Sequence, residues 1–176
     1  MNARDIEIAV ANHFNPRANV IVPNVSWGLF SGGREADILV IRPSAFAAEV
    51  EIKTTAADIK RDLKKKRHRV DKYFDHDKNM IREKYFAVPV ALAAHPDIPA
   101  ECGILAVAED RSWPQVIRRS RLNKNARRLT PTEIHHVMEL GLMRIWTLKE
   151  SLRRAQSKAI SPGDRETNKS LKEAQS

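Results

Sequence analysis

The chain has 176 residues, a length that suits one folded domain. Its hydrophobic share of 42% argues against global disorder. Its formal net charge of +9 favours a polyanionic partner such as nucleic acid, although an anionic membrane surface would suit the same charge. The single Cys102 excludes an intrachain disulfide and a thiolate metal cluster. No apolar run resembles a signal core or a membrane span, so we expect a cytoplasmic protein with no membrane partner.

The chain begins with a predicted helix and two extended segments. An apolar stripe at helical spacing predicts the helix over residues 3–14. Extended segments are expected over residues 20–22 and 25–30, with Pro23 marking a bend between them.

Two short strands then combine apolar and charged side chains. Because strand side chains alternate between faces, Glu35 and Asp37 share one face of the first strand. Glu49, Glu51 and Lys53 share one face of the second, and the other faces of both strands are apolar. Charges on strands this apolar are costly unless something offsets them. A hard divalent cation that handles phosphate would do so, which points to a nuclease.

The short connection between these strands limits their register. In an antiparallel hairpin, a turn centred on Ser44 places Asp37 opposite Glu51, whereas a turn centred on Ala45 places it opposite Lys53. Either register gathers the three groups, but a one-residue slip would separate them across the sheet.

A basic helix is predicted directly after Lys53. Thr55 and Asp58 form an N-terminal capping pattern, so we interpret Asp58 as a helix cap. A second basic stretch, residues 118–128, extends the cationic surface. Basic side chains on the helix are expected to contact a nucleic-acid backbone: Lys60, Lys64, Lys65, Lys66, Arg67 and Arg69.

The remaining pattern completes a mixed α/β order. Further strands are expected over residues 84–88, 103–107 and 115–119. A capping box and Pro131 mark a helix start after Thr130, with Gly141 as a candidate break between two helices. The chain turns polar near residue 155, so we predict a single domain over 1–154 and a mobile tail over 155–176.

The order of these features resembles the PD-(D/E)XK nuclease superfamily: Asp37, then Glu51-x-Lys53 across a hairpin, then a helix directly after the lysine. The resemblance covers roughly residues 3–88, and Ala36 replaces the proline that names the motif. Within the superfamily, residues 49–55 with downstream acids look most like phage-encoded nucleases and MmcB-like DNA repair proteins.

The resemblance implies a restriction-endonuclease-like core, a mixed β-sheet flanked by helices in the order αβββαβ, with a C-terminal helical extension. It implies that Asp37 and Glu51 hold Mg²⁺ or Mn²⁺ and that Lys53 orients or activates the attacking water. Glu7 in the first helix and Glu35 beside Asp37 are rival candidates to complete the metal site.

We therefore predict a metal-dependent DNA nuclease, an endonuclease acting on double-stranded or branched DNA. A homodimer is left open, because many members of the superfamily cut two strands as dimers. The alternative is a non-catalytic nucleic-acid-binding protein on the same fold, acting as a DNA repair or packaging accessory. A basic RNA-binding module is a more remote alternative.

Overall fold

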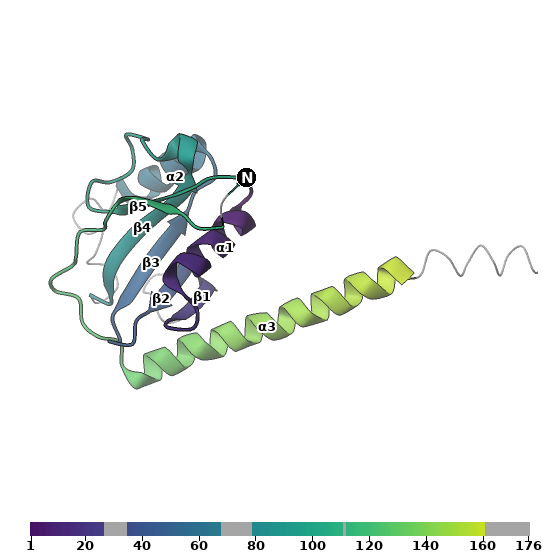
Figure 1. The fold of residues 1–176 in the computed structure, drawn as a ribbon. Helices are drawn as coiled ribbons and strands as arrows, with labels where there is room; N and C mark the ends of the chain where they lie inside the picture. Colours follow the sequence, from purple (N-terminus) through teal and green to yellow (C-terminus); the bar gives the residue numbers. More distant parts are fainter. Residues whose placement is uncertain (27–34, 68–78, 111, 161–176) are drawn as a thin grey trace, which may run out of the picture. The chain divides into compact units, whose positions relative to one another are not determined.

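A six-stranded mixed β-sheet with helices on both faces forms the first of two structural units (Figure 1). The computed structural model describes residues 1–26, 35–67, 79–110 and 112–160. The first unit is Met1–Met138 and the second is Glu139–Ser176. The prediction of a mixed α/β fold is confirmed.

The strands lie side by side in chain order. β1, β2 and β3 form an antiparallel meander, β3, β4 and β5 are parallel neighbours, and β6 returns antiparallel. The elements are α1 (Ala3–Phe14), β1 (Val20–Val25), β2 (Ala36–Ile41), β3 (Ala47–Ile52), α2 (Ala56–Arg67), β4 (Ile81–Pro89), the 3₁₀ turn η2 (Val90–Leu92), β5 (Gly103–Val107), β6 (Gln115–Arg118) and α3 (Pro131–Ile160).

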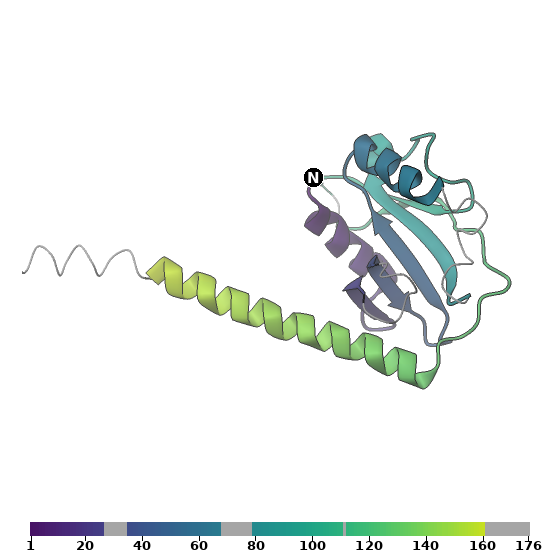
Figure 2. The same ribbon diagram turned by 180° about the vertical axis from the view of Figure 1, so that it is seen from behind.

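The two faces of the sheet carry separate apolar clusters. On one face, Ile6 and Val10 of α1 pack against a cluster that includes Ile38 and Val50 of the central strands. On the other face, Ile59 of α2 packs with a cluster that includes Phe86 and Val88 of β4. The two views agree that α1 and α2 cover opposite faces (Figures 1 and 2).

Local chemistry explains where α1 begins and ends. Asn2 accepts a hydrogen bond from the Asp5 backbone N–H, and the Asp5 carboxylate accepts one from the Asn2 N–H, which completes a capping box. Asn15 ends the helix at a positive φ of 53°, and Pro16 follows.

The first strand differs from its prediction. β1 continues through Pro23, which pairs with Ile38, so Pro23 does not separate two extended segments. β1 lies at the edge of the sheet, where a proline is tolerated because its missing N–H costs no interior ladder bond. Residues 27–30 of the second predicted segment lie outside the described residues.

The C-terminal helix also differs from its prediction. Its start is confirmed, because the Glu133 N–H donates to the Thr130 hydroxyl and the Thr130 N–H donates to the Glu133 carboxylate. However, α3 runs without a break through Gly141 and past residue 155 to Ile160. One glycine costs a helix only about 1 kcal/mol relative to alanine, which a long helix absorbs. Residues 161–176 of the predicted tail lie outside the described residues.

Membrane-spanning character is absent from the described helices, since none combines the length and the apolarity that crossing a bilayer requires.

Candidate active site

The β2–β3 hairpin brings Asp37 and Glu51 together. Ile38 pairs with Val50 and Val40 with Ala48, which is the register of a turn centred on Ser44. The next pair along this register is Asp37 with Glu51, one of the two alternatives that the sequence predicted. Lys53 follows β3 directly, and its backbone N–H donates to Ala87 O of β4 at 3.1 Å.

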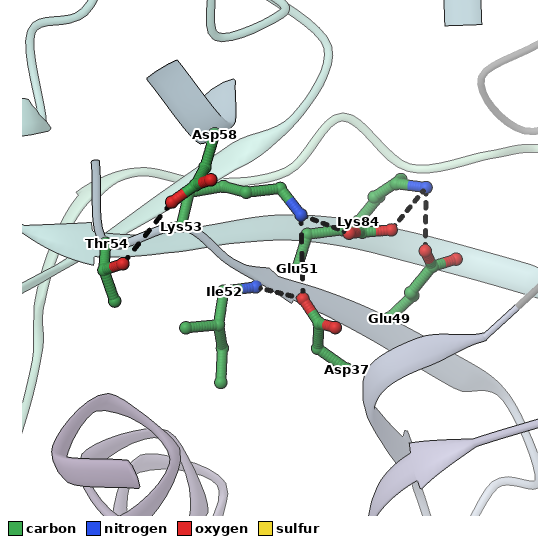
Figure 3. Close-up of polar contacts among 8 residues, drawn as sticks. All are labelled: Asp37, Glu49, Glu51, Ile52, Lys53, Thr54, Asp58 and Lys84. Carbon is green, nitrogen blue, oxygen red and sulfur yellow. Dashed lines mark hydrogen bonds and ion pairs between the residues drawn. The ribbon is translucent and has the colours of Figure 1, made fainter. Parts of the chain in front are cut away.

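The Lys53 ammonium lies between the two acids, as Figure 3 shows. Lys53 Nζ is 2.9 Å from Glu51 Oε2 and 3.7 Å from Asp37 Oδ2. Asp37 Oδ2 also accepts a 2.7 Å hydrogen bond from the Ile52 backbone N–H, which ties the start of β2 to the end of β3. The structure therefore brings all three predicted catalytic residues into one group.

The group opens towards solvent at Asp37. The Glu51 side chain is only 7% exposed and that of Lys53 12%, whereas the Asp37 side chain is 36% exposed. A substrate or a hydrated cation would therefore reach Asp37 first.

The environment of Asp37 disfavours its negative charge. Burial raises the pKa of the Asp37 carboxyl above its ordinary value, and the nearby charge of Glu51 raises that pKa further. The hydrogen bond from the Ile52 N–H and the charge of Lys53 oppose this shift. A bound cation that contacts these carboxylates would, like Lys53, offset the repulsion between them.

A second ion pair lies deeper on the same face, outside the group of site residues predicted from the sequence. Lys84 stands opposite Glu49 in the parallel β3–β4 register, and its Nζ is 2.8 Å from Glu49 Oε1. Lys84 Nζ is also 3.8 Å from Glu51 Oε1. The sequence feature that could have indicated this pair is Lys84 in the apolar predicted strand 84–88, because an unpaired charge there would be costly.

The four predicted metal ligands do not form one ready cluster. Glu35 is exposed just before β2, and Glu7 lies on α1, which packs against the opposite face of the sheet. Among the described residues, which include all four carboxylates, no three His, Cys, Asp or Glu side chains form a group that could hold a metal ion. Asp37 and Glu51 remain as a pair. Such a pair fits Mg²⁺, which is commonly held by one or two carboxylates together with waters and substrate phosphate.

Asp58 belongs to the cap of α2, as predicted, in partnership with Thr55. Its backbone N–H donates to Thr55 Oγ1 at 3.1 Å, and the Thr55 hydroxyl donates to Asp58 Oδ2 at 2.7 Å. This hydrogen bond lowers the pKa of the Asp58 carboxyl. The cap fixes the first turn of the helix two residues after Lys53.

The predicted cationic residues are only partly described. Lys60 is exposed on α2. Lys64, Lys65, Lys66 and Arg67 belong to the same helix, and Arg69 lies outside the described residues. In the second basic stretch, Arg118 donates to Cys102 O at 2.8 Å and Arg127 Nη2 is 2.6 Å from Glu133 Oε1. Those two arginines therefore have structural partners.

A solved structure shares this fold. It is described as "SPO1766 protein of unknown function from Silicibacter pomeroyi", and it is 18% identical in sequence with a TM-score of 0.57. The match covers 89% of this chain and 94% of the other. At this identity the likeness concerns the fold alone. No family model matches the chain, and no curated protein matches it.

Proposed function

We propose that this protein is a metal-dependent DNA nuclease, an endonuclease that hydrolyses phosphodiester bonds at Asp37, Glu51 and Lys53. The observation that carries the proposal is the placement of the Lys53 ammonium within 2.9 Å of Glu51 and 3.7 Å of Asp37. The order of the first six elements, αβββαβ, supports a restriction-endonuclease-like core.

Asp37 and Glu51 would hold Mg²⁺ or Mn²⁺, which when bound supplies charge neutralisation at the phosphoryl group and acidifies a bound water. The hairpin register fixes the two carboxylates on opposed positions of neighbouring strands, so they need little reorganisation to act together. Asp37, the more exposed acid, would form the side of the site that receives substrate.

Lys53 would stabilise the negative charge that develops on the phosphoryl oxygens. Its ammonium is held by Glu51 and is 12% exposed, so it is a fixed charge in a partly dehydrated site. A preorganised charge of this kind is worth more than the same charge in water. Lys53 would also orient the attacking water by donating a hydrogen bond to it.

The helix that follows Lys53 would hold the nucleic-acid backbone. α2 begins at Ala56, three residues after Lys53, and carries a run of basic residues from Lys60 to Arg67. Contacts from such residues to phosphates give affinity and salt dependence without sequence choice.

Cleavage of plasmid and branched oligonucleotide DNA in Mg²⁺ or Mn²⁺ tests the proposal. We expect Glu51→Gln and Lys53→Met to reduce the cleavage rate at least about 100-fold, since each removes a charge from the reacting centre. Glu83→Gln is the matched control, because Glu83 pairs with Arg42 outside the Asp37–Lys53–Glu51 group. Absence of metal-dependent cleavage by the wild type, or equal cleavage by all four proteins, would contradict the proposal.

The alternative function is nucleic-acid binding without cleavage, as a DNA repair or packaging accessory. It is favoured by the lack of a three-ligand metal group among the described residues. It predicts salt-sensitive DNA binding that survives Asp37→Ala, together with no measurable affinity for divalent metals. Competition between DNA and RNA of equal length would separate it from an RNA-binding module.

A further inference from the structure

Lys84 is among the most deeply buried side chains of the protein. It is 1% exposed in β4, and its partner Glu49 is 0% exposed in β3. Removing two charges from water costs several kcal/mol per ion, and a buried ion pair often adds nothing to stability compared with an apolar pair of similar size. Stability alone therefore does not account for the burial of the Glu49–Lys84 pair.

Lys84 makes a second contact, with Glu51. Its ammonium is 2.8 Å from Glu49 Oε1 and 3.8 Å from Glu51 Oε1, while the other oxygen of Glu51 contacts Lys53. Figure 3 shows the resulting row of alternating charges, Glu49–Lys84–Glu51–Lys53–Asp37, which runs from the buried sheet to the half-exposed acid. Glu51 is thus held between two ammonium groups, one at each carboxylate oxygen.

The row also alternates acidic and basic side chains. The row has three acidic and two basic side chains, and a divalent cation that also contacts substrate phosphate would offset the excess of acids. Lys84 places an ammonium group between the buried carboxylates of Glu49 and Glu51, which share a face of β3. Without it, these two like-charged groups would repel each other more strongly.

We propose that Lys84 is a positioning residue for Glu51, and that Glu49 anchors Lys84 for this task. The inference rests on the proposed function, since it assigns Glu51 to the reacting centre. The parallel register fixes Lys84 beside Glu49, and from there its ammonium orients the Glu51 carboxylate towards Lys53 and Asp37. Groups that orient a metal-binding carboxylate typically contribute 10- to 100-fold to metal affinity or activity.

The test replaces both members of the buried pair, so that no charge is left unpaired and the net charge is unchanged. The variants are Glu49→Leu/Lys84→Met and the more polar Glu49→Gln/Lys84→Gln. A matched control, Arg42→Met/Glu83→Gln, removes another ion pair, which joins the residue after β2 to β4 and does not include Asp37. Urea denaturation of each protein establishes that it is folded.

A structural pair and a positioning pair predict different results. If Lys84 positions Glu51, at least one folded paired variant loses 10- to 100-fold in kcat, keeps its KM for DNA within about threefold, and binds Mn²⁺ about tenfold more weakly by calorimetry. The control pair retains wild-type values. If kcat and Mn²⁺ affinity stay within about threefold of wild type in every paired variant that folds, the inference is overturned. Failure of both paired variants to fold would also overturn it, in favour of a structural pair.

These readouts separate this inference from the proposed function. A wild-type protein that binds Mn²⁺ but cleaves no DNA would refute the nuclease proposal, and Lys84 would then be judged by Mn²⁺ affinity alone. A wild-type protein that neither binds Mn²⁺ nor cleaves DNA would refute both.

Discussion

Asp37 lies at the boundary between the buried part of the site and solvent, and its charge is stabilised less well than that of an ordinary surface acid. Burial and the charge of Glu51 raise the pKa of its carboxyl, against the opposing effects of Lys53 and the Ile52 N–H. An acid in this state destabilises the folded protein until a cation binds beside it. In the proposed nuclease, the repulsion that costs stability would also favour the binding of a cation.

We expect Asp37→Asn to increase the free energy of unfolding at pH 7 in the presence of EDTA. The folded pKa of Asp37 lies above its unfolded value, so the folded state binds more protons in the interval between the two. The stability that this group contributes is therefore present below the unfolded pKa and disappears as the pH rises through the folded pKa. The amide oxygen of asparagine can still accept the Ile52 hydrogen bond.

The increase in the free energy of unfolding of Asp37→Asn should be at most about 1 kcal/mol, because the Asp37 side chain is 36% exposed and solvent screens its interactions. Urea denaturation at pH 7 and at pH 4 measures it, and the difference between the two proteins should shrink at the lower pH. Saturating Mn²⁺ should reverse the order at pH 7, because the wild type binds the ion more tightly and so gains more stability from it. A variant that is less stable than wild type in EDTA at pH 7 would contradict this account.

At the level of elements, the start of α2 sets the position of the cationic helix relative to the site. Thr55 caps the helix through its hydrogen bonds with Asp58, and Lys53 lies only two residues earlier. Fraying of the first turn would therefore loosen the connection that holds Lys53.

We expect Thr55→Ala to lower the free energy of unfolding by about 1 kcal/mol, the usual cost of removing a threonine cap. Thr54→Ala is the matched control, since the Thr54 hydroxyl is 3.5 Å from Asp58 and contributes a weaker contact. Denaturant titration of both variants measures the difference. Equal stability of the two variants would show that Thr55 is not the functional cap.

Elements were predictable where the pattern of the sequence is local. The apolar stripe predicted α1, the capping box predicted the start of α3, and the short connection limited the β2–β3 register to two alternatives. Pro23 and Gly141 were misleading, because an edge strand tolerates a proline and a long helix tolerates a glycine.

The Glu49–Lys84 contact could not be predicted in the same way. β4 joins β3 in parallel after the α2 crossover, so no tight turn fixes the register between them. The sequence therefore indicated that Glu49, Glu51 and Lys53 share a face, but not that Lys84 lies opposite Glu49. The same limit applies to Glu7, whose helix could be predicted but not the face of the sheet that this helix covers.

For the whole molecule, the formal net charge of +9 predicts binding to nucleic acid that depends strongly on salt. We expect the triple variant Lys60→Gln/Lys64→Gln/Lys65→Gln to weaken DNA binding to a similar degree for unrelated sequences. The slope of log affinity against log salt should fall by about 0.9 for each phosphate that the variant no longer neutralises.

Fluorescence anisotropy with labelled duplexes measures that slope. The titration runs from about 50 to about 200 mM salt, a range over which affinity for DNA changes strongly. A control triple variant, Lys149→Gln/Arg153→Gln/Arg154→Gln, removes the same charge from α3 in the second unit. Equal weakening in the two triple variants would show that net charge, and not α2, determines binding. The homodimer remains a prediction, which light scattering of the full chain would measure.

The most direct test of the central claim is calorimetric titration of Mn²⁺ into the full-length protein, with Asp37→Asn and Glu51→Gln measured in parallel. If the two carboxylates and Lys53 form a metal-dependent active site, the wild type binds Mn²⁺ and each variant binds at least about tenfold more weakly. Wild-type protein that shows no Mn²⁺ binding, or binding that both substitutions leave unchanged, would contradict the assignment.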